Sequence, residues 1–135
     1  MARIYLLRKG ESVTESIQRI AKTGNIQTAQ ITGIGAVGQA RIAYYNHDSK
    51  QYEVHDYDEH MEVTSMTANV TLSDGKPFLH LHVNLGRRDM SVIGRHLMSA
   101  IADPFLEIVI TETGNRAIRR YDTDLNLTPI SEIEG

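Results

Sequence analysis

Three histidines are placed so that they could bind one metal ion. His80 and His82 flank a single leucine in the apolar segment PFLHLHVNL, and His96 follows fourteen positions after His82. In a β-strand, His80 and His82 point to one face and the leucines to the other, with about 7 Å between the two histidine Cα atoms. Three imidazoles with a free fourth position are typical of a catalytic zinc site. The sequence has no cysteine, so the ligands must come from His, Asp or Glu.

The turn between two predicted strands decides whether His96 can join the pair. If Gly86–Asp89 form a four-residue loop, His96 falls on the leucine face. If Gly86–Arg88 form a three-residue loop, His96 falls opposite Phe78, on the histidine face. A bulge at Gly94 would correct the first case, because one extra residue reverses the facing of everything beyond it.

Charged residues nearby could complete a site. Glu62 could be a fourth ligand or a general base, although a solvated charge at a strand end is the commoner role. Arg87, Arg88 and Arg95 could hold a carboxylate or phosphate through paired hydrogen bonds. Arginines in turns are more often simply solvated.

Length and charge narrow the class of protein. A chain of 135 residues is long enough for one domain, expected over residues 1–135. The formal net charge of −3 gives no general attraction to phosphates, so DNA binding would need a local basic patch. The N-terminal segment carries Arg3 and Arg8 too early for a signal-peptide core, and no apolar run reaches about 20 residues. We therefore expect a cytoplasmic protein without a membrane partner.

The elements that must position the histidines form an α+β pattern. A strand is predicted over residues 2–8, and Ser12 with Glu15 forms a capping box that starts a helix ending at Gly24. From residue 26 onward β-rich segments alternate with turns such as NHDSKQ and SDGKP. The prediction is a mainly antiparallel β-sheet with one main helix packed on it.

Two further patterns have less chemical content. Gly33 and Gly35 lack the helix start that a phosphate site needs, so we interpret them as a bend or a close backbone approach. His47, His55 and His60 lie in the acidic segment NHDSKQYEVHDYDEH. This segment could form a second cation site, but a solvated hairpin is the stronger interpretation.

The sequence resembles the plants-and-prokaryotes-conserved (PPC) domain between about Tyr5 and Leu127. The motifs are a Gly-x-Gly, an Ala-Asn pair before an Asp-Gly turn, a His-x-His strand, and a final Gly-x-His-Leu. They lie in TGIGAV (32–37), EVTSMTANVTLSDGKPFLHLHVNL (62–85) and VIGRHL (92–97). The family commonly has a second glycine where this sequence has Arg95.

The resemblance implies an α+β sheet that assembles as a homotrimer. The PPC fold is also similar to acetolactate decarboxylase and to a zinc-containing ester hydrolase, which hold zinc with a His-x-His followed by another His. Carried to this sequence, those ligands are His80, His82 and His96, with zinc or another divalent metal as cofactor. In plants the domain is joined to an AT-hook that binds DNA, and no such element occurs in this sequence.

Three functional hypotheses follow. The first is a zinc-binding PPC-domain protein acting as a DNA-binding or regulatory module. The second is a zinc-dependent lyase or hydrolase acting on a small acidic or carbonyl substrate. The third is a structural trimer without metal, whose histidines form hydrogen bonds at a subunit interface.

Overall fold

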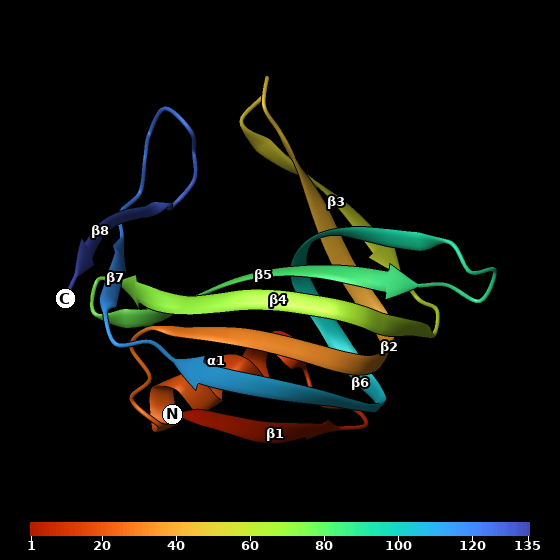
Figure 1. Cartoon of the computed structure of the whole chain (residues 1–135). Helices are drawn as coiled ribbons and strands as arrows, with labels where there is room; N and C mark the ends of the chain where they lie inside the picture. The colour runs from red at the N-terminus through yellow and green to blue at the C-terminus, as the bar shows by residue number, and fades with distance from the viewer.

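One helix and eight strands make up the chain, which the computed structural model describes over residues 1–135 (Figure 1). The elements in chain order are β1 (Ala2–Arg8), α1 (Val13–Thr23), β2 (Ala29–Asn46), β3 (Gln51–Tyr57), β4 (Met61–Ser73), β5 (Lys76–Gly86), β6 (Val92–Glu112), β7 (Arg116–Arg119) and β8 (Ile130–Glu134). The first strand, the helix and the two named turns occur where the sequence predicts them.

The helix α1 begins and ends at its predicted caps. The Ser12 hydroxyl accepts a hydrogen bond from the Glu15 amide at 3.3 Å, and the Gly24 amide donates to the Ile20 carbonyl at 2.9 Å. Its buried stripe, centred on the fully buried Ile17, packs against β5 and β6. The prediction of one helix on one face of the sheet is confirmed. This helix is too short and too polar to cross a membrane.

The sheet has the order β3-β2-β6-β5-β4-β7-β8, with β1 added to β6. A further pairing between β2 and β4 closes β2, β6, β5 and β4 into a ring. The long strands β2 and β6 can serve several neighbours because their pairing is interrupted by register shifts next to Gly33, Gly35 and Arg41, some with the extra residue in β6. All pairings are antiparallel except that of β7 with β4, so the predicted α+β, mainly antiparallel class is confirmed.

The core lies between the sheet and α1. Leu81, Val83 and Leu85 of β5 are each at most 5% exposed, whereas His82 and Asn84 between them are exposed. This alternation is the one predicted from the sequence, with the leucine face inward. The histidines therefore lie on the outer face, which α1 does not cover.

The turn between β5 and β6 is longer than either predicted loop. Gly86 pairs with Val92, which leaves the five residues Arg87–Ser91 in the turn, and His96 pairs with His82 rather than with Phe78. The Asp89 carboxylate stabilises the longer turn by accepting hydrogen bonds from the Ser91 amide and hydroxyl. The loop has an odd number of residues, as in the three-residue alternative, so His96 faces the histidine side and no bulge at Gly94 is needed.

Gly35 marks a close backbone approach inside β2, as predicted, whereas Gly33 is crowded by side chains. A Cβ atom on Gly33 would lie 2.7 Å from the Met66 methyl carbon. Gly35 has φ of +147°, and a Cβ there would overlap the Phe105 carbonyl oxygen and lie 2.9 Å from the Leu106 Cα. This approach lets β2 bend where its pairing with β6 shifts register.

We expect Gly35→Ala to lower the free energy of unfolding by about 2–3 kcal/mol, because the new methyl group meets backbone atoms and the φ angle is strained for alanine. The measurement is urea unfolding followed by circular dichroism. Gly114→Ala is the control, since no atom lies within 4 Å of a Cβ at Gly114, and it should change stability by less than about 0.5 kcal/mol. Equal midpoints for both variants would contradict the assignment of Gly35 as a required close approach.

Candidate metal centre

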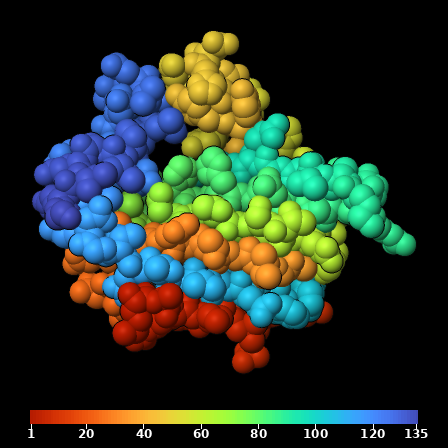
Figure 2. All heavy atoms as spheres, in the orientation of Figure 1, coloured from red at the N-terminus to blue at the C-terminus, as the bar shows by residue number.

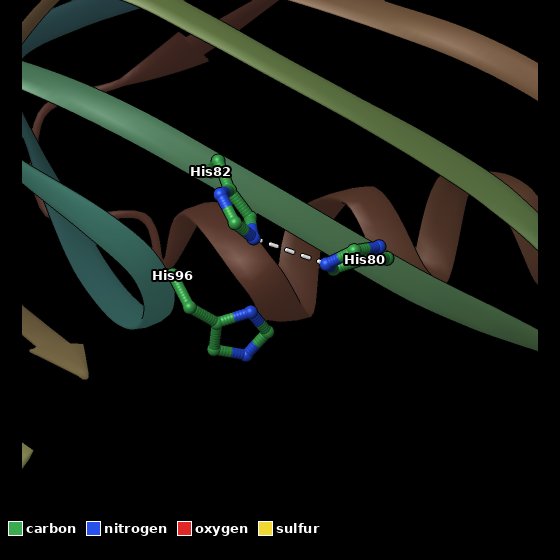
Figure 3. A group of neighbouring side chains, drawn as sticks. All are labelled: His80, His82 and His96. Carbon is green, nitrogen blue, oxygen red and sulfur yellow. Dashed lines mark hydrogen bonds between the residues drawn. The ribbon is translucent and has the colours of Figure 1, made fainter. Parts of the chain in front are cut away.

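The three imidazoles predicted from the sequence converge on the outer face of the sheet. His80 and His82 project from β5, and His96 projects from β6 directly opposite His82 (Figure 3). One ligand nitrogen from each ring lies within 4.8 Å of the corresponding nitrogens of the other two. Strand pairing alone therefore brings the third histidine to the pair.

The spacing of two ring nitrogens, which share a hydrogen bond, is close to that expected for two ligands of one metal ion. The Nε2 atoms of His80 and His82 are 3.1 Å apart, and two nitrogens bound to one zinc ion are expected to be about 3.3 Å apart. The Nδ1 atom of His96 is buried without a hydrogen-bond partner, although buried polar atoms almost always have one. Figure 3 shows a nitrogen of the His96 ring turned toward the other two rings. The donor set is therefore suited to a divalent cation.

The surroundings keep two of the rings neutral. Burial, followed by the neighbouring His80 and His82, lowers the pKa of His96 to about 4. The pKa of His80 is also lowered, first by burial and then by the charges of His82 and Arg119. Metal ions bind the neutral imidazole, so the site is ready to bind a metal near pH 7.

Two tyrosines that the sequence analysis missed pack against the centre. The ring of Tyr52 stacks on His96 with ring centroids 5.0 Å apart, and Tyr45 meets Tyr52 edge-on at 5.8 Å. The NHDSKQ turn makes Tyr45 and Tyr52 cross-strand neighbours, and the sequence could have shown this pairing. The contact of Tyr52 with His96 requires β2 to pair with β6 through Ala43, which no local pattern reveals.

A cavity of about 470 Å³ opens beside the centre and is lined by His82, His96, Arg95 and aromatic side chains of the β2–β3 hairpin. The C-terminal segment reaches the same hairpin. The Tyr45 hydroxyl donates to the Leu125 carbonyl at 2.6 Å, and the Asn126 amide donates to the Lys50 carbonyl at 2.8 Å. In Figure 2 the blue C-terminal segment and the gold hairpin stand on either side of a hollow above the green strands.

Of the three predicted arginines, Arg95 is the one that lines this cavity. Its guanidinium donates to the Gly94 carbonyl at 2.6 Å and lies 5.7 Å from the centre of the Tyr44 ring. A Cβ at Gly94 would overlap Asn84, so glycine is required there, whereas the exposed Arg95 needs no second glycine.

The remaining predicted residues lie away from the imidazoles. Arg87 forms an ion pair with Glu59 at 2.6 Å, and Arg88 is exposed in the same turn. Glu62 pairs with Gly86, which lies four residues beyond His82 along β5. The distance along the strand between the Cα atoms of His82 and Gly86 is about 13 Å. Glu62 is therefore not brought to the three rings.

The histidines of the acidic segment do not form a second cation site. His47 packs edge-on against Tyr45, and His55 lies exposed on β3. The Nε2 atom of His60 forms a hydrogen bond with the Asp103 carbonyl at 2.8 Å. The only group of three or more candidate metal-binding side chains in the chain is His80, His82 and His96. The solvated-hairpin interpretation therefore describes this segment.

Arg119 is a third residue that the sequence analysis missed. The residue is 6% exposed, and its guanidinium lies over the Phe78 ring at 4.9 Å. In the sequence it is one of two adjacent arginines in AIRRYD, and nothing local distinguishes it from the exposed Arg120.

Comparisons with known proteins identify the family. The model of the Plants and Prokaryotes Conserved (PCC) domain, abbreviated PPC above, matches residues 3–114. A metal-containing protein from Archaeoglobus fulgidus is 32% identical, with a TM-score of 0.89 over 98% of this chain and 94% of that chain. A PPC protein from Pyrococcus horikoshii is 30% identical, with a TM-score of 0.90 over 99% of this chain and 93% of that chain. No curated protein matches the chain.

A structure from Bacteroides thetaiotaomicron, described as a candidate DNA-binding protein, is 29% identical, with a TM-score of 0.93 over 96% of this chain and 91% of that chain. α-Acetolactate decarboxylase from Bacillus subtilis shares the fold at 11% identity, with a TM-score of 0.62 over 96% of this chain and 60% of that chain. Both resemblances predicted from the motifs, to the PPC domain and to the decarboxylase fold, are confirmed. The chain belongs to the Plants and Prokaryotes Conserved domain family.

Proposed function

We propose that the chain is a metal-binding PPC-domain module in which His80, His82 and His96 hold one divalent ion, with zinc as the first candidate. The observation that carries this proposal is the buried, unpartnered Nδ1 of His96 beside two Nε2 atoms 3.1 Å apart. Three neutral imidazoles are a donor set that suits zinc. The family relative described as metal-containing adds support.

The proposed centre leaves a coordination position for a ligand. The cluster contains three side chains and no carboxylate, and the adjoining cavity of about 470 Å³ has room for a small molecule. A zinc ion with such an open coordination position polarises a carbonyl group or activates a water molecule. Arg95 is placed to contact an acidic ligand in the cavity, whereas Arg87 is occupied by Glu59.

The cavity also favours a second candidate function, a zinc-dependent lyase or hydrolase for a small acidic or carbonyl substrate. In that role Tyr52 and the hairpin would limit water access to the metal, and Arg95 would orient the substrate. Glu62 lies too far from the rings within the chain to act as a ligand or general base. Turnover that requires the metal would distinguish an enzyme from a binding module.

Within the regulatory hypothesis, DNA binding has less support than binding of a metal or a small ligand. One relative is described as a candidate DNA-binding protein, but the net charge of −3 does not favour several phosphate contacts. Regulation through a metal or a small ligand suits this chain better. A cytoplasmic location stays a prediction.

We also propose that the chain forms a homotrimer through the outer face of the sheet. Ile4 and Leu6 of β1 and Ile34 of β2 are 77%, 47% and 58% exposed. Leu6 and Ile34 both pair with Glu107, so they lie on one face, on either side of that exposed carboxylate. Exposed apolar clusters of this kind are typical of protein interfaces. A trimer without metal is the remaining alternative.

Alanine substitution tests the metal proposal. We expect purified protein to contain about one metal ion per chain, and His80→Ala, His82→Ala and His96→Ala to lose most of it, because two imidazoles bind weakly. Elemental analysis after dialysis against a weak chelator measures this. His55→Ala is the matched control, since His55 lies exposed on β3, outside the cluster. Wild-type protein that takes up no metal would contradict the proposal. Retention of the metal in the three single histidine variants would also contradict it.

The lowered pKa values of His80 and His96 give metal binding an unusual pH dependence. Protons compete with a metal only below the pKa of each ring, and a lowered pKa moves this competition to lower pH. We expect the apparent zinc affinity to change by less than about tenfold between pH 8 and pH 6 and to fall steeply below pH 5. Three imidazoles with ordinary pKa values would lose about 65-fold over the first interval, and competition titration against a chelator separates the two cases.

The trimer proposal predicts a particle of three times the 15.1 kDa chain mass. Ile4→Glu should lower this mass, because it places a charge in the proposed apolar interface. Ile133→Glu is the control, since Ile133 of β8 is 65% exposed but lies on a different part of the sheet. Sedimentation equilibrium measures both variants, and a monomeric wild-type protein would refute the proposed assembly.

A further inference from the structure

Arg119 is a buried cation whose hydrogen-bond partners are all neutral. The residue is 6% exposed. Its Nε donates to the Thr71 hydroxyl at 2.6 Å, Nη1 to the Thr128 carbonyl at 2.8 Å, and Nη2 to the Asn69 side-chain oxygen at 2.9 Å. A guanidinium has five N–H groups, so one N–H on each terminal nitrogen has no protein partner. Buried charges are normally paired with an opposite charge, and this one is not.

The guanidinium lies next to the metal centre. Arg119 is paired with Ser73, and its side chain extends back along β4 past Thr71 to Asn69. Asn69 is the direct cross-strand partner of His80. Side chains that face each other in this way have Cβ atoms about 5 Å apart. The charged end of Arg119 is therefore a neighbour of His80 on the same face of the sheet.

The three imidazoles have a buried cation as a neighbour and no carboxylate among them. A divalent ion held by three neutral imidazoles keeps its full charge, and Arg119 adds another positive charge beside it. No carboxylate belongs to the cluster. In a partly buried site, such an excess of positive charge favours an anion at the open position.

We infer that Arg119 binds a carboxylate of a small acidic ligand whose second oxygen group occupies the open position on the metal. The guanidinium is held in place by Phe78 and three hydrogen bonds, so little ordering is needed when the ligand binds. Its two uncommitted N–H groups are the donors that a carboxylate uses. This inference rests on the proposed metal site and names the class of molecule that the site takes.

The test uses the full chain loaded with Co²⁺, whose visible spectrum changes when a ligand binds. Succinate is the probe, and monomethyl succinate is its partner because it lacks the second negative charge. We expect wild-type protein to bind succinate about tenfold more tightly than the ester. In Arg119→Gln this preference should shrink to less than about twofold, with the cobalt content unchanged.

Arg120→Gln is the matched control. It removes the same charge from the adjacent residue, whose exposed side chain is paired with Glu132 at 3.1 Å, and it should keep the tenfold preference. If Arg119→Gln does not fold, Arg119→Lys replaces it and should lose at least about threefold, because lysine cannot bind a carboxylate with two parallel N–H groups.

The outcomes separate the two proposals. Wild-type protein that binds no cobalt contradicts the metal site itself. Cobalt-loaded wild type that binds both probes equally contradicts the inference about Arg119 alone. An unchanged succinate preference in the folded Arg119 variant, or an equal loss in Arg120→Gln, also overturns it.

Discussion

The centre depends on one pairing of backbones, that of His82 in β5 with His96 in β6. Side chains on paired strands share a face, so a slip of one residue would turn His96 into the core. Several contacts prevent that slip. Leu81 and Val83 are buried on the opposite face, and Gly94 lets the Val83 carbonyl and Asn84 approach where any Cβ would collide. The core and a glycine without a catalytic role thus set the distance between the imidazoles.

The bend of β2 and β6 gives the centre its environment. His96 pairs with His82 on one side and with Ala43 of β2 on the other, so it sits where β6 passes from one neighbour to the next. This brings the β2–β3 hairpin over the histidines and stacks Tyr52 on His96. The resulting burial lowers the pKa of His96 to about 4 and leaves its Nδ1 without a partner. The register shift next to Arg41 and Ile42 thereby influences the surroundings of His96 on the neighbouring strand.

The C-terminal segment supplies a buried cation and backbone contacts around the candidate centre. The side chain of Arg119 in β7 extends along β4 and places an uncompensated positive charge beside His80. Leu125 and Asn126 contact the β2–β3 hairpin. The family match ends at residue 114, so these contacts lie outside it. They place a positive charge and two hydrogen bonds at the edge of the candidate metal centre.

Much of the molecule follows from local sequence. Ser12 and Gly24 bound the helix because their caps need only neighbouring backbone, and the alternation in FLHLHVNL fixes which face is buried because a strand has a period of two. The sequence also singled out the three histidines that converge, because their residue type and spacing limit the chemistry, but the facing of His96 depended on the length of the β5–β6 turn. The length of the β5–β6 turn was not, because Asp89 stabilises five residues where a shorter loop was expected.

Only the tertiary structure decides which charged and aromatic residues reach the centre. Tyr52 and Arg119 come from elements 28 or more residues away in the chain from His80 and arrive through the β2–β6 and β4–β7 pairings, which leave no local pattern. For the same reason Glu62 and Arg87, which lie near the histidines in the sequence, are not brought to the rings. Residue types set what the site can bind, and long-range strand pairing sets which groups surround it, because burial and charge depend on distance in space.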